Sequence, residues 1–143
     1  MKKLAILGST GSLGTQVLDV VRSFPRNFQV VGLVAGRNVD KLKSQIREFN
    51  PKFVSVSCDA EKKLGLLKSG TIECSINDLV VNSEADMIVT TSVGDVALMP
   101  TFLALESGKD VVLGNKESVV MAGQVLVDIA KNRGSRILPI DSE

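Results

Sequence analysis

Short apolar runs, each about as long as a β-strand, recur along the chain between stretches long enough for helices. They lie at residues 4–7, 30–35, 53–56, 87–89, 111–113 and 137–140. In the segments 13–24, 39–49 and 119–130, apolar residues recur at the helical period, and the first of these patterns places Val20 and Phe24 on the buried face. The alternation predicts an α/β fold with a doubly wound, mostly parallel sheet and helices on both faces.

Residues that interrupt a helix close the periodic stretches. Proline follows Phe24 and Asn50, and glycine follows Ser107 and Arg133. The pattern is weakest over residues 64–83, where it predicts a short edge strand at 71–74 and a short helix at 76–81. Because no repeat, low-complexity tract or linker interrupts the chain, we interpret residues 1–143 as one domain.

Glycine-rich and polar groups follow five of the predicted strands. In an open α/β sheet, ligands bind beside the carboxyl ends of the strands, so these groups are expected to gather at one edge. They are residues 8–14, 36–38, 90–94, 114–117 and 141–143.

The first group contains three glycines, Gly8, Gly11 and Gly14, spaced GxxGxxG between a strand and a helix. Glycines let the backbone turn tightly and approach a pyrophosphate, the helix start offers free N–H groups, and Thr10 and Ser12 add hydroxyl donors. An ordinary tight strand-to-helix turn is the alternative interpretation. The flanking pattern favours a Rossmann-like, dinucleotide-binding turn.

The end of the second strand indicates which dinucleotide is bound. Domains specific for NAD usually carry an acid there, about 20 residues after the glycines, to bind the ribose 2′-hydroxyl. No acid occurs between Asp19 and Asp40, and the strand ends in Gly36, Arg37 and Asn38. A guanidinium can pair with a 2′-phosphate, which predicts NADP(H); a solvated surface charge is the alternative for Arg37.

The last group places two carboxylates, Asp141 and Glu143, on one side of a strand end. Their hard oxygen ligands suit Mg²⁺ or Mn²⁺. At a neighbouring strand end, Lys116 could hold an anionic substrate near that metal. A helix start at Glu117 and a solvated tail at 141–143 are equally compatible with these residues.

Composition excludes several classes of protein. The chain has 143 residues, 44% of them hydrophobic, and its 17 basic and 16 acidic side chains nearly cancel, so neither a nucleic-acid nor a membrane-surface partner is expected. The first apolar stretch is too short for a signal peptide or membrane span, which favours a cytoplasmic location. With no histidine and with Cys58 and Cys74 isolated, soft-metal sites and the usual hydrolase triads are not expected.

Taken together, four motifs resemble the N-terminal domain of the 1-deoxy-D-xylulose 5-phosphate reductoisomerase family over essentially the whole chain. They are GSTGSLG at 8–14, AGRN at 35–38, NKES at 115–118 and LPIDSE at 138–143. The resemblance implies an NADPH-dependent and divalent-metal-dependent enzyme of non-mevalonate isoprenoid biosynthesis. Such an enzyme isomerises and reduces 1-deoxy-D-xylulose 5-phosphate to 2-C-methyl-D-erythritol 4-phosphate.

The resemblance also implies roles for single residues. The glycine turn, Gly8 to Gly14, would bind the NADPH phosphates through Thr10, Gly11, Ser12 and Leu13, and Gly36, Arg37 and Asn38 would bind the adenosine end with its 2′-phosphate. Asn115 and Glu117 would contact the cofactor; Lys116, Ser142 and Glu143 the substrate; and Asp141 and Glu143 the metal. Lys116, Asp141 and Glu143 would form the catalytic set in this domain.

Two residues depart from the family pattern. Gly114 stands where the family has alanine, which should only loosen the strand end. Asp95 puts a carboxylate into a loop that is usually apolar near the cofactor, with an effect that the sequence does not predict.

The chain ends at Glu143, whereas the family continues into a catalytic domain with a third metal ligand, the substrate-phosphate site and the main dimer contacts. The 143 residues alone are therefore expected to bind NADPH without turnover, and the full-length protein to be a homodimer. Two alternatives stay open: another NADP-dependent oxidoreductase, of the semialdehyde dehydrogenase kind, and a nucleotide- or CoA-sensing module. Metal dependence separates the sensing module from the reductoisomerase: the sensing module should bind its ligand without Mg²⁺, whereas a longer chain of the reductoisomerase should need the ion.

Overall fold

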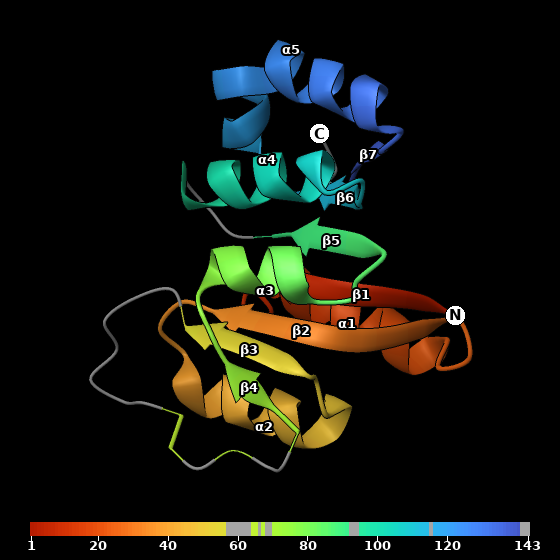
Figure 1. Cartoon of the computed structure of the whole chain (residues 1–143). Coiled ribbons are helices and arrows are strands. Elements are labelled where there is room, and N and C mark those ends of the chain that lie inside the picture. Colours follow the sequence, from red (N-terminus) through yellow and green to blue (C-terminus); the bar gives the residue numbers. More distant parts are fainter. Residues whose placement is uncertain (57–63, 66, 68–69, 92–94, 115, 141–143) are drawn as a thin grey trace.

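The computed structural model describes residues 1–56, 64–65, 67, 70–91, 95–114 and 116–140. Within these ranges seven parallel strands form one sheet in the order β4-β3-β2-β1-β5-β6-β7 (Figure 1). The predicted doubly wound parallel sheet is therefore confirmed. The strands are β1 (Lys2–Leu7), β2 (Phe28–Ala35), β3 (Phe53–Val56), β4 (Ile72–Glu73), β5 (Met87–Thr90), β6 (Asp110–Leu113) and β7 (Ile137–Pro139).

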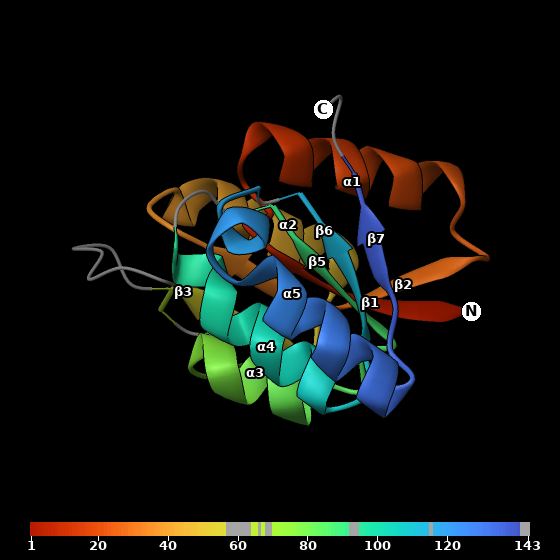
Figure 2. The same cartoon turned by 90° about the horizontal axis from the view of Figure 1, so that it is seen from above.

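Helices cover both faces of the sheet (Figure 2). One face carries α1 (Ser12–Ser23) and α2 (Val39–Phe49). The other carries α3 (Ile76–Asn82), α4 (Leu98–Glu106), which follows the short 3₁₀ turn η1 (Asp95–Ala97), and α5 (Lys116–Arg133). Among the described residues, no helix is both long enough and apolar enough to cross a membrane.

The alternation of side chains along β1 explains the three layers. Leu4 and Ile6 point into the core beneath α1 and α2, while Ala5 and Leu7 point into the core beneath α3, α4 and α5. All four are at most 4% exposed. A strand buried on both faces is apolar at every position, which is why the sequence of β1 is a continuous apolar run.

Several helix ends follow the sequence signals. Asn50, which caps α2, has a left-handed φ of 48°, and the glycines at 108 and 134 have φ of 76° and 71°. The weakly predicted segment also agrees, since β4 occupies Ile72–Glu73 and α3 occupies Ile76–Asn82.

The predicted buried face of α1 was wrong at two positions. Val20 and Phe24 are 50% and 54% exposed, and the buried residues are Gly14, Leu18 and Val21. Gly14 packs closely on the preceding turn, and this contact fixes how α1 is rotated about its axis. Positions 18 and 21 lie on the same face of the helix as Gly14. The buried face of α1 is therefore the one with positions 14, 18 and 21, and Val20 and Phe24 lie outside it.

The predicted helical run over 119–130 also contains an unpredicted break. Ala122 has φ −147° and ψ 26°, so α5 is two helical pieces joined at a kink. Gly123 follows this kink, and a glycine inside a helix lowers the cost of such a break.

Candidate cofactor-binding site

The order of the strands identifies where a ligand can bind. The chain runs outward from β1 through β2, β3 and β4, then returns to β5 on the other side of β1 and runs outward again through β6 and β7. In such sheets the crevice beside the carboxyl ends of the two central strands is open, because the connecting helices leave in opposite directions. Here that crevice lies beside the ends of β1 and β5.

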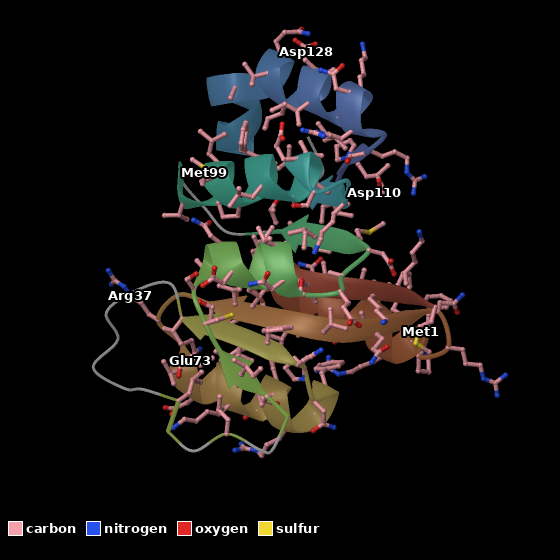
Figure 3. The ribbon with its side chains drawn as sticks, viewed as in Figure 1. Met1, Arg37, Glu73, Met99, Asp110 and Asp128 are labelled. Carbon is pink, nitrogen blue, oxygen red and sulfur yellow. The ribbon has the colours of Figure 1, made fainter. Side chains whose placement is uncertain are left out.

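A cavity of about 400 Å³ occupies this edge. It brings together the ends of β1, β2 and β5, which are far apart in the sequence. Figure 3 shows Arg37 at this edge, projecting beyond the end of β2. The lining residues are Gly8, Thr10, Gly11, Val34, Ala35, Gly36, Arg37, Asn38, Thr91 and Val96.

The glycine turn is held against β2 by its own backbone. The N–H groups of Gly8 and Ser9 both donate to the carbonyl of Val34, at 2.8 and 2.9 Å, and Gly8 has φ 90°. The N–H of Gly11 donates back to the carbonyl of Gly8 at 3.2 Å. Gly8 therefore needs the left-handed backbone that glycine alone adopts easily.

Gly14 lets the first turn of α1 sit directly on this loop. A Cβ atom at position 14 would lie 2.1 Å from the carbonyl oxygen of Gly8 and 2.8 Å from the Cα of Ser9. Gly11 is different, since a Cβ there would meet only the Gly8 oxygen, at 3.5 Å. Gly14 is therefore required by packing within the protein, whereas Gly11 leaves open space beside the cavity.

Three side chains that the sequence did not predict as site residues stabilise the glycine turn by hydrogen bonds. The Thr91 hydroxyl donates to the carbonyls of Leu7 and Gly8, at 2.8 and 3.0 Å. The Lys41 ammonium donates to the carbonyl of Thr10 at 3.1 Å. Gln45 exchanges two hydrogen bonds with Ser9, with the Ser9 hydroxyl donating at 2.7 Å and the Gln45 amide donating to the Ser9 carbonyl at 2.9 Å.

Sequence reasoning missed these three residues, although signals for two of them exist. Thr91 falls in the segment 90–94 that was expected at this edge. Gln45 is a polar residue between Leu42 and Phe49 at helical spacing, hence on the apolar face of α2. A polar side chain at such a position needs a buried partner. Lys41 carried no signal beyond its charge.

Arg37 and Asn38 form the junction between β2 and α2. Asn38 caps the helix, with its Oδ1 accepting from the N–H of Lys41 at 3.1 Å, so its amide Nδ2 is the group that can donate to a ligand. Arg37 is exposed at the rim of the cavity, and no carboxylate in the described ranges pairs with it. Lys41, in the first turn of α2, places a second cation beside the Thr10 carbonyl, although it does not itself line the cavity.

Three predicted cofactor residues follow Gly11 in the chain and do not themselves line the cavity. Ser12 and Leu13 begin α1, together with Gly14. The Leu13 side chain packs against Gly114 at the end of β6, where a Cβ would come within 2.6 Å of Leu13 Cδ2 and 3.1 Å of the carbonyl of Thr90. The expectation that Gly114 only loosens the strand end was incomplete, because its missing side chain makes room for Leu13.

The second predicted constellation is described only by its backbone. Lys116 and Glu117 are the first residues of α5, directly after the end of β6, and their side chains lie outside the described set. Asn115, Asp141, Ser142 and Glu143 lie outside the described residues altogether. The N–H of Ile140 donates to the carbonyl of Leu113 at 3.1 Å, so the chain follows β6 to its carboxyl end before Asp141 begins.

The described residues contain no group of three or more His, Cys, Asp or Glu side chains that could hold a metal ion. This does not include the predicted ligands Asp141 and Glu143. Asp95 begins η1, and its side chain too lies outside the described set. The metal site therefore stays a prediction from the sequence.

A second cavity, of about 470 Å³, lies beside the ends of β3 and β4 and shares Val96 with the first. Cys74 lines it. Burial raises the pKa of the Cys74 thiol, and the nearby carboxylates of Asp78 and Glu73 raise it further. The thiol is therefore protonated at neutral pH and is a poor nucleophile, as expected for a structural cysteine.

Comparison with known proteins gives a consistent family. The family model described as 1-deoxy-D-xylulose 5-phosphate reductoisomerase matches residues 4–123. The reductoisomerase of Thermoanaerobacter sp. (strain X514) is 46% identical over 149 residues, and that of Crocosphaera subtropica is 42% identical over 154 residues. Each alignment covers all of this chain, but only 39% and 38% of the relative.

Solved structures agree. A DOX-P reductoisomerase in complex with magnesium superposes with a TM-score of 0.92 at 36% identity, covering 100% of this chain and 38% of that one. The enzyme from Zymomonas mobilis in complex with NADPH superposes with a TM-score of 0.88 at 32% identity, and the match covers 99% of this chain and 39% of that one. An archaeal homoserine dehydrogenase, at 17% identity and a TM-score of 0.68, covers 96% of this chain and 43% of that one and shares only the fold. This chain thus spans about two fifths of the length of the reductoisomerases that it matches.

Proposed function

Because this chain belongs to the 1-deoxy-D-xylulose 5-phosphate reductoisomerase family, we propose that its residues bind NADPH and supply part of the metal and substrate site of such an enzyme. The reaction would be the NADPH-dependent and metal-dependent isomerisation and reduction of 1-deoxy-D-xylulose 5-phosphate to 2-C-methyl-D-erythritol 4-phosphate in isoprenoid biosynthesis. The active protein would include the length that the relatives have beyond this chain, and it would be a cytoplasmic homodimer.

One observation carries the cofactor assignment: the glycine turn and the Arg37–Asn38 junction line a single cavity at the switch point of the sheet. The cofactor pyrophosphate would lie on Thr10, Gly11, Ser12 and Leu13, where N–H groups at the start of α1 can donate to it. The open space beside Gly11 supports this fit, since a side chain there would occupy the approach to the turn.

The adenosine end would lie at the start of α2. Gly36 would allow close approach, the Arg37 guanidinium would pair with the 2′-phosphate, and Nδ2 of Asn38 would donate beside it. In the reductoisomerase complex with NADPH, fosmidomycin and magnesium, the superposed chain has a TM-score of 0.90 and 36% identity to this one. That likeness supports NADPH as the dinucleotide.

The substrate side would be formed by the segments after β6 and β7. Bound NADPH supplies the hydride, and a bound Mg²⁺ or Mn²⁺ polarises the substrate oxygens. Two carboxylates, Asp141 and Glu143, offer the hard oxygen donors that such an ion prefers. Lys116, Ser142 and Glu143 would bind the substrate, and Asn115 and Glu117 the cofactor near its reacting end.

Titration of the 143-residue chain with NADPH and NADH, followed by nicotinamide fluorescence, tests the proposal. We expect saturable binding with NADPH preferred by at least about tenfold, unchanged when Mg²⁺ is removed, and no reduction of the sugar phosphate. The full-length protein should require the metal for turnover and lose activity with EDTA. Equal affinity for the two nucleotides, or turnover by these residues alone, would contradict it.

Gly114→Ala tests the contact behind the turn. The new Cβ would push Leu13 from its position, because the Cδ2 atom of Leu13 lies 2.6 Å from where the Cβ would be. We expect NADPH affinity to fall roughly three- to fivefold, with a small loss of thermal stability. Adding Leu13→Val, which removes the clashing methyl group, should recover most of the affinity. No recovery in the double variant would mean that Leu13 does not transmit the effect.

A further inference from the structure

Ser9 differs from the rest of the glycine turn. Its neighbours Gly8 and Thr10 line the cavity, whereas Ser9 is 0% exposed and faces the interior. Both of its polar groups on that side are bound by one side chain, Gln45 of α2, which is itself only 5% exposed. The turn is therefore bound from behind by a residue 36 positions later in the sequence.

The pair is specific to this place in the fold. Gln45 lies on the buried face of α2 with Val39, Leu42 and Ile46, where an apolar side chain would satisfy the packing of the helix. A buried amide is costly unless both its oxygen and its nitrogen are bound. The Ser9 hydroxyl donates to Oε1 at 2.7 Å, and Nε2 donates to the Ser9 carbonyl at 2.9 Å, so both requirements are met by the turn.

The bond to the Ser9 carbonyl also fixes a neighbouring N–H group. The peptide between Ser9 and Thr10 is trans, so its N–H points opposite to its carbonyl. With the carbonyl directed at Gln45, the N–H of Thr10 is directed away from the core, and Thr10 lines the cavity. Within the described residues, no acceptor takes that N–H.

Rotation of this peptide changes ψ of Ser9 and φ of Thr10. Neither residue is a glycine, so the backbone already limits the rotation, and the hydrogen bond from Gln45 holds the observed orientation further. The Gly8 and Ser9 N–H groups are bound to Val34, but neither of those bonds involves the peptide between Ser9 and Thr10. Gln45 is the described side chain that holds its carbonyl.

We propose that Gln45 is a positioning residue for the cofactor: it locks the peptide between Ser9 and Thr10 so that the Thr10 N–H is presented to the cofactor pyrophosphate. The inference rests on the proposed function, since it assumes that a dinucleotide occupies this cavity. Gln45 touches no cofactor atom in this arrangement and acts only through Ser9. Loss of the Gln45 side chain lowers the affinity for ligands that carry a pyrophosphate and leaves the affinity for ligands without one unchanged.

The test compares two ligands in the 143-residue chain. Gln45→Met keeps the approximate size of the side chain and removes both hydrogen bonds. NADPH affinity should fall about tenfold, as expected when a donor to a charged group is misplaced. The affinity for 2′-AMP, which carries the adenosine and 2′-phosphate but no pyrophosphate, should change less than twofold. The NADPH-induced shift of the Thr10 amide NMR signal should be lost as well.

Ser9→Ala is the matched control. It removes the hydroxyl bond to Gln45 and lowers thermal stability, but it keeps the bond from Gln45 to the Ser9 carbonyl. NADPH affinity should therefore stay within twofold of the unmodified chain. If Gln45→Met fails to fold, Gln45→Leu replaces it, because this apolar side chain also removes both hydrogen bonds and suits the buried face of α2.

The outcomes separate the two proposals. Unchanged NADPH affinity in a folded Gln45 variant, equal weakening of NADPH and 2′-AMP, or an equal effect of Ser9→Ala would overturn the positioning role while leaving the proposed function intact. Failure of the unmodified chain to bind NADPH would overturn both. A selective loss of NADPH affinity in the Gln45 variant alone supports the positioning role.

Discussion

Gly14→Ala is expected to abolish measurable NADPH binding and to destabilise the chain by roughly 3 kcal/mol. The added Cβ would lie 2.1 Å from the carbonyl oxygen of Gly8 and 2.8 Å from the Cα of Ser9. Both are backbone atoms, which cannot rotate aside as a flexible side chain can. Either α1 must lift from the turn or the turn must move, and both changes displace the groups that line the cavity.

The matched control for this prediction is Gly11→Ala. A Cβ at position 11 meets only the Gly8 oxygen, at 3.5 Å, and the residue has an ordinary φ of −77°. This variant should keep its stability within about 0.5 kcal/mol while losing NADPH affinity, since its methyl group enters the space beside the cavity. Urea unfolding and fluorescence titration measure the two effects. If Gly14→Ala proves as stable as Gly11→Ala, the close packing of α1 on the turn is not what requires the glycine.

The sheet could be predicted from the sequence because it is buried on both faces. Every residue from Leu4 to Leu7 is apolar, and each contacts one of two cores, so a continuous apolar run was a reliable signal. The rotation of α1 could not be predicted in the same way. It depends on the contact of Gly14 with Gly8, and a residue without a side chain contributes nothing to an apolar periodicity.

The candidate site was partly predictable for a similar reason. Gly8, Thr10, Gly11 and the Arg37–Asn38 junction follow strands directly, so the parallel order alone brings them to one cavity. Side chains that support the turn from behind, such as Gln45, come from the middle of a helix. Their partner is fixed by how α2 packs on the sheet, which the sequence pattern does not specify.

Asn38 shows a further limit. The sequence suggested that its side chain faces a 2′-phosphate, and the structure shows its Oδ1 capping α2 through the N–H of Lys41. Both roles are compatible, since a carboxamide has an acceptor and a donor end. A residue type that serves as a helix cap and as a ligand donor cannot be assigned to one role from sequence alone.

Arg37→Ala is expected to weaken NADPH binding roughly 10- to 30-fold while changing NADH affinity less than twofold. The guanidinium is exposed at the rim of the cavity and has no carboxylate partner in the described ranges, so it is available to a 2′-phosphate. A charge-assisted, forked pair with phosphate contributes about 1.5–2 kcal/mol at such a partly solvated position. NADH lacks the 2′-phosphate, so the loss of the guanidinium should leave its affinity nearly unchanged.

Two further variants separate geometry from charge. Arg37→Lys keeps the positive charge without the planar fork, so it should lie between the unmodified chain and Arg37→Ala in NADPH affinity. Arg26→Ala removes an exposed arginine from the connection between α1 and β2, at the opposite edge of the sheet. This variant should change the affinity for neither NADPH nor NADH. The difference between NADPH and NADH should also shrink as salt is raised, because the pair is exposed. If Arg37→Ala and Arg26→Ala have the same effect on NADPH, the selectivity arises from general charge and not from a 2′-phosphate contact at Arg37.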